Sequence, residues 1–157
     1  MLVVISYNMG KEDNNKQINA AINDKSKEED NSQPNAKNNV SEENTEQENI
    51  LLSNISEYFN AALKHKQAKE YNSAVTLFFK AIAALGDLFL LRNENKIPNS
   101  HTKRFEILKN KYKEIYLILD RDFPFYQDSY ANKMGLEPTE LLENDARELI
   151  KKLNLKL

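Results

Sequence analysis

One segment of this chain, residues 72–91, constrains the fold more than any other. Apolar side chains occupy nearly every side of a helix drawn through it: Val75, Leu77, Phe78, Phe79, Ile82, Leu85, Leu88 and Phe89. Such a helix must be buried on most sides. Lys80 and Asp87 interrupt it, and charges at the centre of a bilayer are costly. We therefore predict a central core helix and no membrane span, with Lys80 and Asp87 marking its one exit to solvent or to a polar partner.

Helical spacing of apolar residues also precedes and follows this segment. Before it, from about Thr45 to Lys69, one stripe reads Leu52, Ile55, Phe59 and Ala62. After Gly135, Pro138 suits the first turn of a last helix, whose stripe reads Leu142, Ala146, Leu149 and Leu153. Alternating strand patterns are absent apart from Leu2 to Ile5. The predicted fold class is all-α, an antiparallel up-and-down bundle of four to five helices.

The stretch between these helices contains two prolines that predict its boundaries. Pro98 disfavours helical dihedral angles at the residue before it, and Ser100 is a good N-cap, so we predict a loop followed by a helix from His101. Its apolar spacing continues through Tyr130. Pro124 falls inside that pattern, removes a backbone donor and predicts a kink or break near Arg121.

The N-terminal third has a different composition from the rest. Residues 11–50 hold five lysines against ten acidic residues, and residues 51–157 hold seventeen basic against fourteen acidic residues. Asparagine, glutamate and lysine dominate the first region, which offers little apolar surface to offset the entropy of ordering. We predict a disordered, acidic, Asn-rich tail over residues 1–45 and one helical domain over residues 46–157. The tail is interpreted as a linker or an interaction segment.

Cysteine is absent and the formal net charge is −2. These facts exclude disulfides, thiolate zinc sites and a cysteine nucleophile, and they offer no general electrostatic case for nucleic acid or an anionic membrane. The two histidines, His65 and His101, are far apart in sequence. We expect no metal, no cofactor and a cytoplasmic location.

Three segments resemble the HEPN superfamily of small prokaryotic helical domains. They read QAKEYNSAVTLFFKAIAALGD, IPNSHTKRFEILK and LDRDFPFYQDSY, and the resemblance covers about residues 50–153. It implies an antiparallel bundle, frequently a homodimer, in a family of RNA-cleaving toxins, partners of nucleotidyltransferases and non-catalytic modules. Ser100, His101 and Arg121 stand where the pattern would place them. In nuclease members an Arg is followed four to six residues later by His, and no His follows Arg121 in that window.

The residues that could carry catalysis each have a structural alternative. RNA cleavage without a metal needs a group that exchanges protons near neutral pH, which suits imidazole and not phenol. Arg121 could bind a phosphate or pair with a nearby carboxylate. Tyr126 could donate a proton or pack in the core or an interface. His101 could work with Arg121 or simply pack across a helix start.

The residues that could carry binding divide into a basic run and an aromatic group. Lys103 and Arg104 open the run from His101 to Lys113, which could follow a nucleic-acid backbone or form an ordinary solvated face. The aromatic group around Pro124 consists of Phe123, Phe125, Tyr126 and Tyr130. It exceeds what one bundle interior easily absorbs, and aromatic side chains are enriched at interfaces.

Two functions of different classes remain at this point. The first is a non-catalytic HEPN-like module that dimerises and engages a protein partner, such as a nucleotidyltransferase, or RNA. The second is a HEPN-like ribonuclease that uses Arg121 with an unconventional acid or base. The missing His favours the first. We expect a homodimer with both Arg121 side chains near its two-fold axis.

Overall fold

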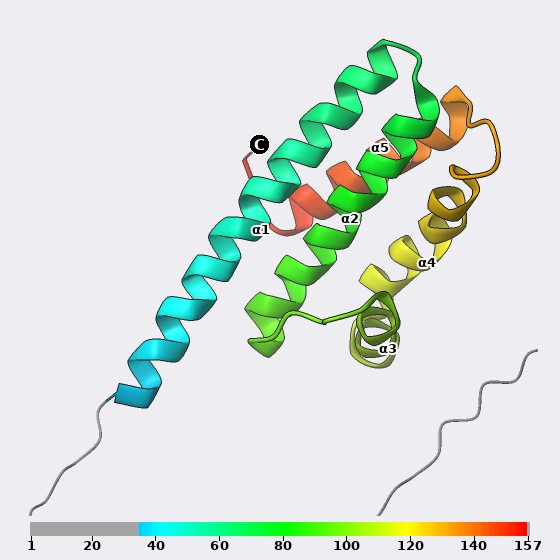
Figure 1. Ribbon diagram of the computed structural model, residues 1–157. Coiled ribbons are helices and arrows are strands. Elements are labelled where there is room, and N and C mark those ends of the chain that lie inside the picture. The colour runs from blue at the N-terminus through cyan, green and yellow to red at the C-terminus, as the bar shows by residue number, and fades with distance from the viewer. Residues whose placement is uncertain (1–34, 157) are drawn as a thin grey trace, which may run out of the picture. The chain divides into compact units, whose positions relative to one another are not determined.

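The computed structural model describes the backbone of residues 35–156 and the side chains of residues 42–156. Its helices are α1 (Asn35–Gln67), α2 (Tyr71–Glu94), α3 (His101–Lys111), α4 (Lys113–Asp128) and α5 (Leu136–Lys152), with no strand among the described residues. α1 and α2 form an antiparallel hairpin, α5 packs chiefly against α2, and α4 packs against α2 and α3, with α3 seen nearly end-on in Figure 1. The predicted all-α bundle is confirmed.

α2 is the central element, as its apolar residues predict. It packs against α1, α4 and α5, and its residues Phe78, Phe79, Ile82, Leu85, Leu88 and Leu90 are among the largest fully buried side chains. Its length and composition would also suffice to cross a membrane, but 78% of its most apolar window is buried inside the bundle. The two charges that interrupt α2 take the two predicted alternatives: Lys80 is exposed to solvent, and Asp87 is buried against a polar partner, Arg104 of α3.

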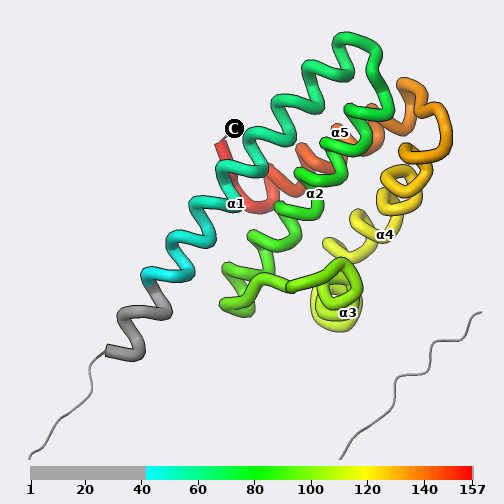
Figure 2. The backbone as a smooth tube through the Cα atoms, viewed as in Figure 1, coloured from blue at the N-terminus to red at the C-terminus, as the bar shows by residue number. Residues whose placement is uncertain are grey.

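α1 begins well before the predicted start near Thr45, and Figure 2 follows its tube past the end of α2. Polar contacts join the part of α1 at residues 44–48 to the end of α2. Arg92 of α2 donates to Glu48 Oε1 from Nε at 3.0 Å and from Nη2 at 2.6 Å, and Asn44 donates to Asn95 at 3.5 Å. Apolar spacing could not reveal such contacts. The predicted tail otherwise lies outside the described residues.

The break in the predicted third helix occurs at Tyr112 and not near Arg121. Tyr112 has φ −134° and ψ 63°, so it separates α3 from α4. Its ring packs edge-on against Phe89, with centroids 4.8 Å apart, and its hydroxyl donates to Glu94 Oε1 at 2.5 Å. These contacts with α2 hold the bend. Pro124 lies inside α4, which continues through it.

The loop before α3 agrees with its prediction. Asn95 ends α2 in the left-handed conformation, with φ 53° and ψ 35°. Ser100 is the N-cap of α3, and its hydroxyl accepts a hydrogen bond from the Lys103 backbone N–H at 3.2 Å. A capping hydroxyl satisfies one of the backbone donors left free at a helix start.

Asn72, in the first turn of α2, clamps the connection between α4 and α5. Its side-chain amide donates to the carbonyl oxygens of Ser129 at 2.7 Å and Asn132 at 2.6 Å. Its Oδ1 accepts from the Met134 backbone N–H at 3.0 Å. One side chain thus satisfies three backbone groups of an irregular turn and ties that turn to the core helix.

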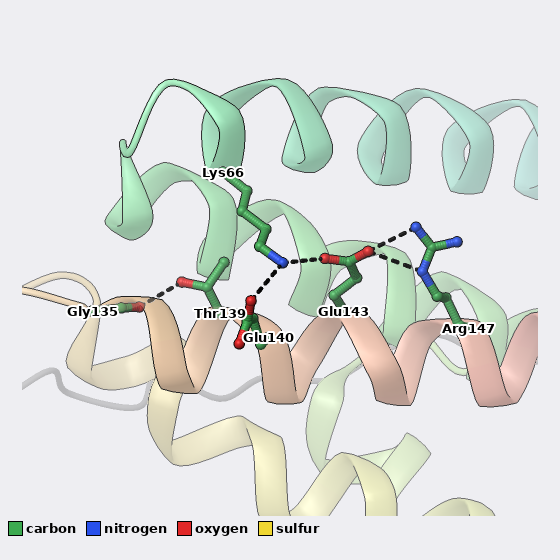
Figure 3. Close-up of polar contacts among 6 residues, drawn as sticks. All are labelled: Lys66, Gly135, Thr139, Glu140, Glu143 and Arg147. Atoms are coloured by element: carbon green, nitrogen blue, oxygen red, sulfur yellow. Dashed lines mark hydrogen bonds and ion pairs between the residues drawn. The ribbon is translucent and has the colours of Figure 1, made fainter.

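An ion-pair network, which we call the α1–α5 network, joins the end of α1 to α5 (Figure 3). Lys66 reaches from α1 to Glu140 at 3.2 Å and to Glu143 at 2.8 Å. The other oxygen of Glu143 accepts from Arg147 at 2.7 Å, and the Arg147 guanidinium lies 5.0 Å from the Phe59 ring centroid. The network contains two cations and two anions, so its formal charges balance.

Candidate functional site

His101 is held by an arginine at the start of α3. Arg104 binds Asp87 with two parallel hydrogen bonds of 2.6 Å, and its Nη1 donates to His101 Nδ1 at 2.8 Å. An arginine side chain has donors only, so Nδ1 must be the acceptor. The ring proton of neutral His101 is therefore on Nε2.

The charge state of His101 follows from the same surroundings. Burial, with the positive charge of Arg104, lowers the pKa of His101 below its ordinary value, against an opposing effect of Asp87. His101 is therefore neutral at pH 7. A general base needs a free nitrogen lone pair, and here Nδ1 is occupied and Nε2 carries the proton. This arrangement makes His101 a hydrogen-bond donor and a poor base.

His101 belongs to a row of aromatic rings that we call the aromatic face. Its members come from α3, α4 and the residues just after α4: His101, Phe105, Tyr116, Phe123, Tyr126 and Tyr130. Centroids lie 6.2 Å apart for Phe105 and Tyr116, 5.4 Å for Phe105 and Phe123, and 5.8 Å for Phe123 and His101. Tyr126 stacks on buried Phe79 of α2 at 4.8 Å. The row is therefore anchored on the core.

The outer end of the aromatic face is open to solvent. Tyr130 is 72% exposed, and its hydroxyl donates to the Tyr126 hydroxyl at 2.6 Å. Phe105, Tyr116, Phe123 and Tyr126 are each half-buried, and His101 is exposed. The face thus presents the edges of several rings that are fixed from behind, a property of protein-interaction sites.

Arg121 and Phe125 lie on the other flank of α4. Residues two apart in a helix are separated by about 200° around its axis, so Arg121 and Phe123 point to opposite flanks. Arg121 Nη2 donates to Asp145 Oδ2 of α5 at 2.5 Å, and the Arg121 side chain is 50% exposed. Phe125 is half-buried, one turn further along. The structure therefore separates Arg121 and Phe125 from the predicted partners Tyr126 and Tyr130.

Asp122 is the residue that sequence reasoning missed. It lies at the inner side of α4, is 0% exposed, and neither carboxylate oxygen has a hydrogen-bond partner. Burial and the nearby Asp145 raise the pKa of Asp122 to about 8, against the opposing effect of Arg121. A signal was present in the sequence, because Asp122 falls four and three residues after Ile118 and Leu119 on the apolar stripe.

Three of the five cations in the basic run are paired with neighbouring carboxylates. Arg104 is buried against Asp87, and Lys103 pairs with Glu106 at 3.0 Å. Lys109 lies 5.8 Å from the Tyr116 ring centroid, and Lys111 pairs with Glu94 at 2.6 Å. The run therefore does not form a continuous positive stripe of the kind that follows a nucleic-acid backbone.

Neither metal-ligand geometry in the described part of the chain nor similarity to known proteins assigns a function. Within residues 42–156, no group of three or more His, Asp or Glu side chains is arranged to hold a metal ion. No family of known proteins, no curated protein and no solved structure matches this chain.

Proposed function

We propose that this chain is a non-catalytic, HEPN-like binding module that pairs with a second copy of itself through the aromatic face. The observation that carries the proposal is the half-exposed row of rings that ends at Tyr130, which is 72% exposed. Rigid aromatic side chains bring a large contact area at a low cost in conformational entropy. Rings fixed on the core are therefore well suited to a partner.

The geometry of the charged residues argues against the alternative ribonuclease. His101 presents a protonated nitrogen, and Arg104 occupies its other nitrogen. Arg121 donates to Asp145, a neutralising partner that phosphate would have to displace. Tyr126 shares a hydrogen bond with Tyr130, and this bond and burial raise its pKa, so its phenol is a poor base. These three residues do not supply an acid and base pair.

Charge across the face supports a second copy as the partner. Lys109 of α3 and Asp120 of α4 are both exposed and border the same row of rings. A two-fold interface must be self-complementary, because each subunit presents the same surface. This requirement is met when α3 of one copy crosses α4 of the other, because Lys109 of each copy then faces Asp120 of the other copy. A nucleotidyltransferase-type protein or RNA would engage the same rings in the competing outcomes.

Light scattering of the full chain across micromolar concentrations tests the pairing. The wild type should have the mass of a dimer, and Tyr130→Glu should raise the dissociation constant at least about 100-fold by placing an unpaired charge in the contact. Leu117→Glu is the matched control, since Leu117 is also an exposed apolar residue, at 53%, but lies outside the row of rings. The control should leave the mass unchanged.

Three results would contradict the proposal in different ways. A monomeric wild type at every concentration would remove the homodimer. Equal loss of pairing in both variants would mean that the contact lies elsewhere on α4. Cleavage of RNA by wild-type protein that Arg121→Ala abolishes would restore the ribonuclease.

A further inference from the structure

The contact between α4 and α5 contains two buried carboxyl groups and one guanidinium group. Asp122 is 0% exposed and Asp145 is 5% exposed. Arg121 donates to Asp145 at 2.5 Å, whereas its Nε lies 3.5 Å from Asp122 Oδ1, too far for a good hydrogen bond. With every group ionised, the site would carry a net charge of −1, with both negative charges buried, which is costly.

Other charged side chains on the neighbouring helices do not correct this imbalance. On α2, Asp87 is bound by Arg104, and Lys80 lies 5.6 Å from the Tyr58 ring centroid on the α1 side. Within the described part of the chain, Arg121 and Asp145 are the charged groups that act on Asp122. The second link between α4 and α5, from Lys152 to Glu114, is exposed and separate.

A single proton resolves the imbalance. Two ionised carboxylates can only accept hydrogen bonds, so neither can donate to the other, and neither oxygen of Asp122 has a hydrogen-bond partner. A protonated Asp122 becomes a donor, and Asp145 is the carboxylate beside it that can accept. The site then holds one anion and one cation, joined through Arg121.

We propose that a proton on Asp122 latches α4 to α5, and that its release loosens this contact and weakens self-pairing through the aromatic face. The effect on pairing rests on the proposed function, whereas the latch does not. The connection is short, because Phe123 of the aromatic face directly follows Asp122 in the same helix. A displacement of α4 that relieves the buried charge therefore also displaces the rings.

The direction of the pH dependence follows from linkage. The pKa of Asp122 is about 8 in the folded chain, against an ordinary value of 3.8. When folding raises the pKa of a carboxyl group, its proton stabilises the folded chain in full at any pH below the pKa of the unfolded chain. This stabilisation is lost as the pH rises through the pKa of the folded chain. The stabilisation from the proton therefore declines between about pH 4 and pH 8, and in the folded chain the latch stays closed until the pH rises through about 8.

A carboxyl titration of the wild-type chain tests the latch directly. Carbon-13 NMR of the Asp122 side-chain carboxyl, assigned with Asp122→Asn, reports its protonation without altering the protein. We expect a midpoint near pH 8. A midpoint near pH 4 would overturn the proposal, because Asp122 would then be ionised throughout the neutral range.

Urea denaturation at several pH values tests the consequence for folding. The equilibrium constant for unfolding of the wild type should rise, relative to that of Asp122→Asn, by about tenfold for each pH unit between pH 5 and pH 7. Glu148→Gln is the control, an exposed acid of α5 that lies outside the aromatic face, and it should follow the wild type. Equal pH slopes in the wild type and Asp122→Asn would overturn the latch.

Light scattering at pH 6.5 and pH 9 separates the latch from the pairing. The wild type should dissociate more readily at pH 9, and Asp122→Asn should pair equally well at both values. A chain that is monomeric at both values while its carboxyl titrates near pH 8 would leave the latch in place and remove the proposed pairing. A dimer of unchanged affinity would overturn the regulation of pairing while the pairing itself stands.

Discussion

α5 carries two ionic clusters that differ in charge balance and in access to water. The α1–α5 network holds Lys66 and Arg147 against Glu140 and Glu143, and parts of all four side chains reach solvent. The cluster with α4 holds Arg121 against Asp122 and Asp145, and both acids are buried. A balanced and wetted network tolerates full ionisation, whereas a buried cluster with an extra anion requires a proton. Similar residue types thus respond to pH in opposite directions.

The largest expected effect is on the cluster between α4 and α5. Arg121→Met at pH 9 should lower the free energy of unfolding by about 2 kcal/mol, because it leaves two buried carboxylates without a cation. This is less than is typical when a partner is removed from a fully buried pair, since Arg121 is 50% exposed and water can partly replace it. Urea denaturation at pH 9 and pH 5 measures the change. The cost should be smaller at pH 5, and an equal cost at both values would contradict a proton on Asp122.

The opposite pH response should appear in the α1–α5 network. Burial acts to raise the pKa of Glu143, but hydrogen bonds from Lys66 and Arg147 outweigh it, so the pKa is lowered from the ordinary value of 4.5. When folding lowers the pKa of a carboxyl group, its negative charge stabilises the folded chain at any pH above the pKa of the unfolded chain. This stabilisation is lost as the pH falls through the pKa of the folded chain.

Lys66→Met should therefore cost about 1 kcal/mol at pH 7 and progressively less below pH 4.5. Denaturation series at pH 7 and pH 3 compare the variant with the wild type. Asp122→Asn provides the contrast, because it should change the neutral and alkaline range and leave the acid range alone. A Lys66→Met cost that grows in acid would break the comparison between the clusters.

The smallest effect is expected at the exposed link between α4 and α5. Lys152 and Glu114 approach to 2.5 Å, but their side chains are 40% and 82% exposed. Exposed pairs contribute little to stability, so Lys152→Ala should change the free energy of unfolding only slightly. The difference should disappear in 1 M salt. A loss comparable to that of Arg121→Met would mean that the exposed pair, and not the buried cluster, holds the two helices together.

Sequence periodicity predicted the elements whose formation depends on local apolar spacing. The burial of α2, the stripe of α5 and the Ser100 cap belong to this class. The bend at Tyr112 does not, because Glu94 and Phe89 of another helix hold it. No local signal such as glycine marks that position, and the proline that does occur lies inside α4 without ending it.

The candidate site shows the same division between local and distant determinants. The aromatic group was visible in the sequence, since its members lie close together along the chain. The division of these aromatic residues between two flanks of α4 depends on where α5 packs. The pairing of Arg121 with Asp145, twenty-four residues away, depends on the same packing. The His101 tautomer likewise depends on Arg104, whose orientation is fixed by Asp87 of α2. Residue types alone contain none of these relations.

The Asn72 clamp has a consequence for the order in which the chain folds. It joins α2 to a turn about sixty residues further along the chain. Among the described hydrogen bonds of α2, the bond to Met134 encloses the longest stretch of chain. Closing a long loop costs chain entropy before any contact compensates, whereas the hairpin of α1 and α2 needs only a short connection. The hairpin is therefore the natural folding nucleus, and the clamp belongs to the last step, when α4 and α5 dock. Loss of the clamp should accelerate unfolding and leave the refolding rate almost unchanged.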